Sequence, residues 1–173
     1  MTSAAKLKKV RAVNAGPKSG PAQARRRLYG NAITRINNAI EHRYPLESIA
    51  LLESMMADRL EARLAWLHQQ GVNKREFSTL GKLTQELCSA LSNESDEAKS
   101  VYEAIKAWAN RRNEALHQMA KLVEDDPKDW KARLREAQAT AEAGVPLFNK
   151  VTALVRKLNR PPKPVVAATQ PRN

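Results

Sequence analysis

The regular spacing of apolar residues between positions 45 and 67 constrains the fold of this chain more than any other feature. Leucine, isoleucine and methionine recur there every three or four residues, from Ile49 to Leu67. This spacing puts the apolar side chains on one side of an α-helix. Pro45 suits the first turn of such a helix, and Gly71 suits its end because a polar loop follows. A long amphipathic helix is therefore expected from Pro45 to about Gly71, and other helices must cover its apolar side.

The remaining helices are expected at four places along the chain. Residues that favour helices dominate the composition, and β-branched and aromatic residues are few. Ser95 suits the N-cap of one helix, and Asp126 followed by Pro127 suits the start of the last, which we expect to be interrupted near Pro146. The expected ranges are 28–42, 80–91, 96–123 and a final helix from about 127 to 159. The fold class is thus all-α, an antiparallel bundle of four to five helices.

The positive charge of the chain is confined to its two ends. The formal net charge is +12, yet residues 41–159 hold eighteen Lys/Arg and eighteen Asp/Glu. We therefore expect a basic flexible tail at 1–27, a helical domain at 28–159, and a proline-rich flexible tail at 160–173. Clustered cations bind phosphate chains by releasing counterions, which favours an RNA-binding tail, although such tails also serve as solubilising segments. The candidate RNA-binding residues of the first tail are Lys6, Lys8, Lys9, Arg11, Arg25, Arg26 and Arg27.

Cysteine usage and hydropathy restrict the class of protein. Cys88 is the single cysteine, so an internal disulfide is impossible and a reducing compartment is favoured. No apolar run approaches the roughly 20 residues needed to span a bilayer, and no signal-peptide core is present. We expect a cytoplasmic protein without a membrane partner; an organellar transit peptide is the alternative interpretation of the basic start.

Motifs for metals and cofactors are missing from the sequence. It contains no CxxC or HExxH motif and no glycine loop that would hold phosphates. The acidic run at 124–126 is better explained by helix capping than by metal binding. We therefore expect neither a metal nor a cofactor. Trp66, Trp108 and Trp130 occupy helical positions and are expected to be core residues rather than platforms for stacking bases.

One helical segment carries a motif with chemical meaning. Residues 108–117 read WANRRNEALH, in which Arg112 is followed directly by Asn113 and, after four intervening residues, by His117. The segment resembles the HEPN superfamily, whose mark is an arginine, four to six residues and a histidine, with a polar residue after the arginine. The order of helices over about 28–125 is similar to that of the family as well.

This resemblance implies a metal-independent endoribonuclease. In such enzymes the 2′-hydroxyl of RNA attacks the neighbouring phosphate and leaves a 2′,3′-cyclic phosphate, at a composite site between two copies. Arg112, Asn113 and His117 would be the catalytic residues. Histidine with its ordinary pKa near ~6.5 serves as acid or base, and a guanidinium offers the phosphate a fork of donors. Small HEPN proteins are commonly toxins or antiviral effectors, so an antitoxin or a nucleotidyltransferase is a possible partner.

The spacing of the motif gives a physical interpretation beside the resemblance. On a helix Asn113 and His117 share a face, and Arg112 lies about 100° around from Asn113. Between them runs an apolar stripe, which would pack either against a second copy or against the chain's own core. The stripe consists of Ile105, Ala109, Leu116 and Ala120.

Other residues fit parts of the same pattern. Arg63 with His68 has the same spacing and Arg35 with His42 the six-residue spacing, but an apolar residue follows each arginine. Five residues separate Arg111 from His117, so Arg111 fits the five-residue spacing and ranks second. Asp58 and Glu61 are candidates to support Arg112 or His117, but surface ion pairs with Arg59, Arg63 or Arg75 are the favoured interpretation.

Two functions therefore remain open on the sequence alone. The first is an RNA-cutting homodimer that uses Arg112, Asn113 and His117. The second is a non-catalytic helical module that binds nucleic acid or dimerises, with the basic tails holding the nucleic acid. A weaker third possibility is a helical structural protein that binds DNA or a membrane through its tails.

Overall fold

The computed structural model describes residues 20–68, 78–90, 95–120 and 129–159, and these residues form five α-helices without a strand. The all-α prediction is therefore confirmed for the described residues. The helices are α1 (Gly20–Glu41), α2 (Pro45–Leu67), α3 (Leu80–Ala90), α4 (Asp96–Ala120) and α5 (Trp130–Leu158).

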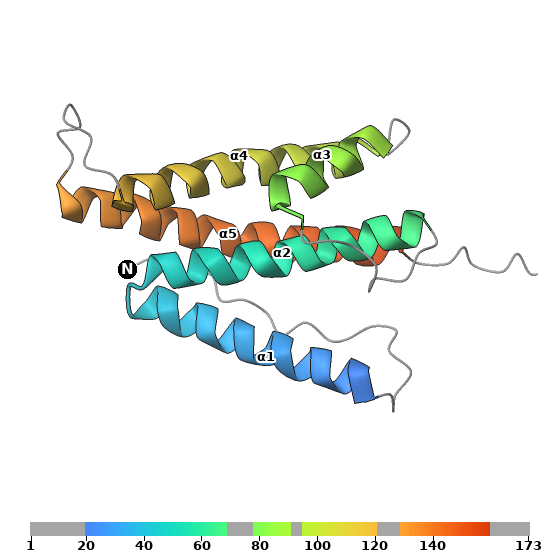
Figure 1. Ribbon diagram of the computed structural model, residues 1–173, viewed down its shortest axis with the longest axis horizontal. Helices are drawn as coiled ribbons and strands as arrows, with labels where there is room; N and C mark the ends of the chain where they lie inside the picture. Colours follow the sequence, from blue (N-terminus) through green and yellow to red (C-terminus); the bar gives the residue numbers. More distant parts are fainter. Residues whose placement is uncertain (1–19, 69–77, 91–94, 121–128, 160–173) are drawn as a thin grey trace, which may run out of the picture.

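The helices α2 and α5 form the middle of the bundle. Helix α1 packs mainly on α2, while α4 packs on α5 and α3 bridges α2 and α4 (Figure 1). Neighbours α1 and α2 run antiparallel, as do α4 and α5, but α2 and α5 run in the same direction (Figure 1). One continuous core of buried apolar side chains joins all five helices.

Side-chain caps explain several helix starts. Ser95 Oγ accepts a hydrogen bond from the backbone N–H of Ala98 at 3.4 Å, as expected for an N-cap. At the start of α5 the cap is Asp129, whose Oδ1 accepts from the N–H of Ala132 at 2.6 Å. Asp126, the predicted cap, lies outside the described residues. Asp129, which was expected in the first turn of the helix, is its N-cap instead.

The first helix begins earlier than the sequence suggested. Helix α1 starts at Gly20, so the predicted boundary at residue 28 is wrong and residues 20–27 are helical. Proline is tolerated at Pro21 because the first turn needs no backbone donor there, and the alanine, glutamine and arginine that follow favour helices. Residues 1–19 and 160–173, which carry most of the two predicted tails, lie outside the described residues.

The last helix is continuous through Pro146, against the predicted interruption. A proline inside a helix leaves the carbonyl four residues earlier, here that of Glu142, without its donor. Pro146 and Glu142 are both exposed, so water can solvate that carbonyl. The flanking Val145, Leu147 and Phe148 are buried in the core, and their packing holds the helix together.

A close junction between α2, α4 and α5 sets the position of the motif helix. Trp108 on α4 is fully buried, and its indole N–H donates to the carbonyl of Thr140 on α5 at 2.9 Å. Gly144 on α5 lies against that indole and against Leu52 of α2 so closely that a Cβ atom would sit 2.8 Å from Cδ1 of Leu52. The junction therefore fixes α4 one turn before Arg112.

The other two tryptophans are not core residues. Trp66 is 47% exposed and Trp130 is 60% exposed, so the expectation holds for Trp108 alone. Trp66 instead stacks against Arg63, whose guanidinium carbon lies 4.8 Å from the centre of the Trp66 ring. Cys88 is half-buried and packs on the core, as expected for a small apolar side chain. Within the described ranges, none of the helices combines the length and the apolar character that a membrane crossing requires.

Candidate active site

Arg112 is held in place by an acid from another helix. Its Nη2 donates to Oε1 of Glu53 on α2, and the pair is mostly sheltered, with the side chains 15% and 26% exposed. The Nε of Arg112 is buried and has no hydrogen-bond partner in the described part of the chain. Glu53 engages only one end of a guanidinium that has five donors. Glu53 therefore restrains Arg112 between α2 and α4.

Asn113 and His117 lie on the outer side of α4. Both are exposed, and neither side chain has a hydrogen-bond partner among the described residues. They are one turn apart on one face, as their spacing predicts. Arg111 is exposed as well, without an anchoring acid in the described ranges, so it lacks the restraint that Arg112 has.

A lysine continues the same outer face toward the start of α4. Lys106 lies about two turns before Asn113. Its hydrogen bond to Glu103, at 2.9 Å, raises the pKa of the Lys106 amine. The outer face of α4 thus presents the Lys106–Glu103 pair, the amides of Asn110 and Asn113, and an imidazole to solvent.

The apolar stripe between Arg112 and Asn113 belongs to the chain's own core. Ile105 and Ala109 are buried there, and Leu116 is half-buried. The interpretation in which these residues pack against a second copy is therefore wrong for Ile105 and Ala109. The side chain of Ala120 is not among those described. A second copy would have to meet the exposed face of α4 instead.

The two acids considered as supports for the motif lie elsewhere. Asp58 accepts a hydrogen bond from the hydroxyl of Tyr29 on α1, next to Arg59, whose guanidinium lies 4.4 Å from the centre of the Tyr29 ring. Asp58 therefore ties α1 to α2, and the acid on Arg112 is Glu53. Glu61 is half-buried on α2 and is not the acid found on Arg112.

Glu53 could have been singled out from the sequence as an acid that needs a cationic partner, although not as the partner of Arg112. It lies four residues after Ile49, three before Met56 and seven before Leu60, inside the apolar side of α2. A carboxylate at such a position needs a cation from a neighbouring helix to offset its burial.

The first rival pair has a structural role. Arg63 is buried, and its Nη1 donates to the carbonyl of Leu158 at 3.2 Å and to Oδ1 of Asn159 at 3.0 Å. It therefore caps the C-terminal end of α5. Nε2 of His68 lies 3.8 Å from Oε1 of Glu86 on α3, so His68 and Arg63 contact different parts of the bundle. This pair has the right spacing, but its guanidinium is committed to the fold.

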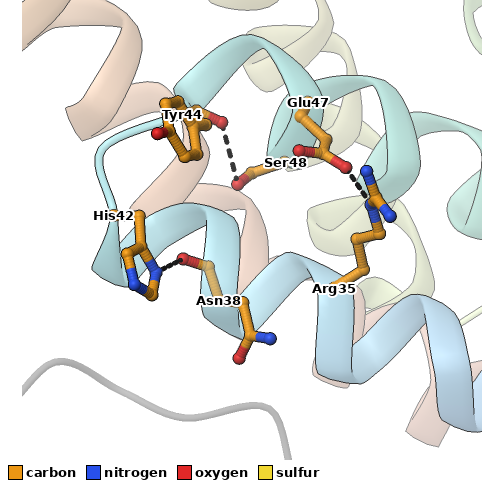
Figure 2. A network of polar contacts seen from close by, with 6 residues as sticks. All are labelled: Arg35, Asn38, His42, Tyr44, Glu47 and Ser48. Carbon is orange, nitrogen blue, oxygen red and sulfur yellow. Dashed lines mark hydrogen bonds and ion pairs between the residues drawn. The ribbon is translucent and has the colours of Figure 1, made fainter.

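The second rival pair lies at the turn between α1 and α2. Arg35 donates to Glu47, which raises the pKa of Arg35, and His42 donates from Nδ1 to the carbonyl of Asn38 at 2.8 Å (Figure 2). Both side chains line an open hollow together with Tyr44. Unlike Arg112, Arg35 is largely exposed.

The remaining predicted residues are only partly described. Arg26 and Arg27 are exposed on α1, and the side chain of Arg25 is not described. Lys6, Lys8, Lys9 and Arg11 lie outside the described residues. No group of three or more histidine, cysteine or acidic side chains within the described ranges could hold a metal ion.

Comparisons with models of known protein families, with curated proteins and with solved structures found no match. The function of the site is therefore argued from its residues and their geometry.

Proposed function

We propose that the chain is a metal-independent endoribonuclease of HEPN type, with Arg112, Asn113 and His117 as its catalytic residues. One observation supports this most. An exposed histidine and asparagine stand one turn apart on α4, next to an arginine that Glu53 restrains. Asn113 and His117 are open to a substrate, whereas the Arg112 side chain is 15% exposed, so in this proposal the phosphate meets the guanidinium at its exposed edge.

The chemistry follows from the three side chains. The imidazole of His117 removes the proton of the 2′-hydroxyl or delivers a proton to the departing 5′-oxygen. The guanidinium of Arg112 stabilises the charge that grows on the phosphate, and its restraint by Glu53 lowers the cost of orienting it. Asn113 orients the imidazole or the ribose. The attacking oxygen comes from the RNA itself, so the scheme needs no cofactor.

A second copy completes the site in this proposal. One chain offers one imidazole, whereas the reaction uses both a base and an acid. A two-fold axis beside the exposed face of α4 brings two copies of Asn113 and His117 together across one cleft. The small side chains of Ala107 and Asn110 on the same face allow the two helices to approach.

The test is cleavage of a structured RNA in the presence of a chelator. The parent chain should cut the RNA, and the His117→Ala variant should not. His68→Ala is the matched control because His68 is also exposed and also follows an arginine at the same spacing. Equal cutting by the parent and His117→Ala would refute the proposal. A DNA of the same sequence should stay intact because it lacks the 2′-hydroxyl.

Mixing experiments test the dimer. If the site is composite, a subunit-exchanged equal mixture of parent and His117→Ala should retain about a quarter of the parent activity, since only one dimer in four has two intact copies. Retention of about half would mean that each chain works alone. Binding of RNA without cutting would instead support the non-catalytic module, in which the basic segments hold nucleic acid. A toxin or antiviral role, and an antitoxin or nucleotidyltransferase partner, belong to the same proposal and depend on detecting cleavage first.

A further inference from the structure

The turn between α1 and α2 forms an open hollow that the proposed catalytic residues do not use. Its volume is about 480 Å³, within the range of about 300–1,000 Å³ typical of sites for small organic ligands. Seven of its eight lining residues carry polar groups, although apolar atoms form most of the lining surface. Figure 2 shows the rings of His42 and Tyr44, the amide of Asn38 and the guanidinium of Arg35, and Asn31 adds a second amide. The lining residues are Asn31, Thr34, Arg35, Asn38, Ala39, His42, Tyr44 and Glu47.

The two rings form an exposed aromatic platform. The planes of His42 and Tyr44 are within 8° of parallel, with their centres 6.4 Å apart. Tyr44 is 62% exposed although it is a large apolar side chain. Arg43, between them, has a φ of 60°, an uncommon backbone conformation for a residue other than glycine. A ring kept in solvent beside a second parallel ring suits stacking of a planar ligand.

The tautomer of His42 adds an acceptor to the hollow. The carbonyl of Asn38 can only accept, so Nδ1 of His42 carries the proton and leaves Nε2 as an acceptor in the neutral ring. The side-chain amides of Asn31 and Asn38 have no hydrogen-bond partner among the described residues. Each amide offers both a donor and an acceptor. These groups match the mixed donors and acceptors along the edge of a nucleobase.

The charge of the surrounding surface suits a phosphate chain. The exposed face of α1 that leads to the hollow carries no carboxylate from Arg27 to Asn38, about three turns of helix. The exposed Glu41 lies just beyond it, next to His42, and Glu47 lines the hollow itself. Arg35 is paired with Glu47, but the pair is exposed and therefore costs little to separate. The Arg35 guanidinium can thus turn from Glu47 to a phosphate. The Glu47 carboxylate competes for the guanidinium and repels the phosphate.

The position of the hollow relates it to the candidate active site. The C-terminal end of α1, the start of α2 and the C-terminal end of α4 lie at one end of the molecule (Figure 1). We propose that the hollow at the α1–α2 turn binds an unpaired nucleotide of single-stranded RNA, with the base stacked on Tyr44 and His42 and the phosphate on Arg35. The inference rests on the proposed function, in which RNA is the substrate. It assigns a second binding site for that RNA, apart from the catalytic residues.

The test is binding of a short, fluorescently labelled single-stranded RNA to the full chain, in the His117→Ala background so that no cutting interferes. Tyr44→Ala should weaken binding by at least about fivefold, the smaller end of the loss of one base–aromatic stack. Tyr44→Phe retains a ring and should bind within about twofold of the background. Trp66→Ala is the matched control, because Trp66 is an exposed aromatic at the opposite end of α2.

Two variants that change charge should shift the affinity for RNA in opposite directions. Arg35→Gln should weaken binding and reduce the salt slope by about 0.7, the value for one phosphate contact on a single strand. Glu47→Gln should tighten binding because it removes the carboxylate that competes for Arg35.

The inference is overturned if Tyr44→Ala binds like Trp66→Ala, if a fully paired duplex binds as well as the single strand, or if no oligonucleotide binds. Loss of binding in Tyr44→Ala alongside a parent that never cuts RNA would support this site while refuting the proposed nuclease.

Discussion

Replacing Gly144 by alanine probes the packing that positions the motif helix. A Cβ atom at Gly144 would lie 2.8 Å from Cδ1 of Leu52 and 2.9 Å from Nε1 of Trp108. Atoms in contact normally stay about 3.5–4.0 Å apart, so the Leu52 and Trp108 side chains must shift, or α5 must move away from α2 and α4, by several tenths of an ångström. Overpacking of this kind costs about 1–3 kcal/mol.

The matched control is Gly30→Ala in the middle of α1, where a Cβ atom would meet nothing within 4 Å. Both substitutions gain helix propensity, so the difference between their free energies of unfolding isolates the overpacking cost of about 1–3 kcal/mol. At about 2–4 °C per kcal/mol for a chain of this size, the melting temperature of Gly144→Ala should fall about 2–12 °C below that of Gly30→Ala. Thermal unfolding followed by circular dichroism measures this. Equal melting temperatures would refute the close junction of α2, α4 and α5.

Three further substitutions test the caps and the ion pair. Asp129→Ala should lower the free energy of unfolding by about 0.5–2 kcal/mol in urea titrations, because the N–H of Ala132 loses its cap; an unchanged value would contradict the start of α5. Arg63→Met should cost about 1.5–3 kcal/mol, because the end of α5 loses charge-assisted hydrogen bonds, and a neutral result would remove its capping role. Glu53→Gln should lower the cleavage rate at least about tenfold, roughly 1.4 kcal/mol, while the chain stays folded; unchanged cleavage would show that Glu53 does not orient Arg112.

The parts of the fold that followed from the sequence are those set by apolar spacing and local capping. The apolar spacing from Ile49 to Leu67 determines which face of α2 is buried, and Ser95 determines where α4 starts. Both depend only on residues that are close together in the sequence. The start of α1 was misjudged because the arginines near Gly20 were weighted as tail charge rather than as helix formers. Pro146 was misjudged because its cost depends on whether Glu142 faces solvent, which the tertiary packing decides.

The candidate site shows the same division. The i, i+4 relation of Asn113 and His117 is local, and so it could be predicted from spacing. The acid on Arg112 comes from a different helix, fifty-nine positions away, and depends on how α2 and α4 pack around α5. The same holds for Ile105 and Ala109, whose burial in the chain's own core is a property of the packed bundle.

The end groups of the cleaved RNA test the central claim most directly. The claim is that His117 and Arg112 activate the RNA's own 2′-hydroxyl. Incubation of the parent chain with RNA in chelator should give fragments that end in a 2′,3′-cyclic phosphate, and a single 2′-deoxy substitution at the cleaved nucleotide should abolish the cut. Fragments with a 3′-hydroxyl, or cutting that survives the 2′-deoxy substitution, would contradict it.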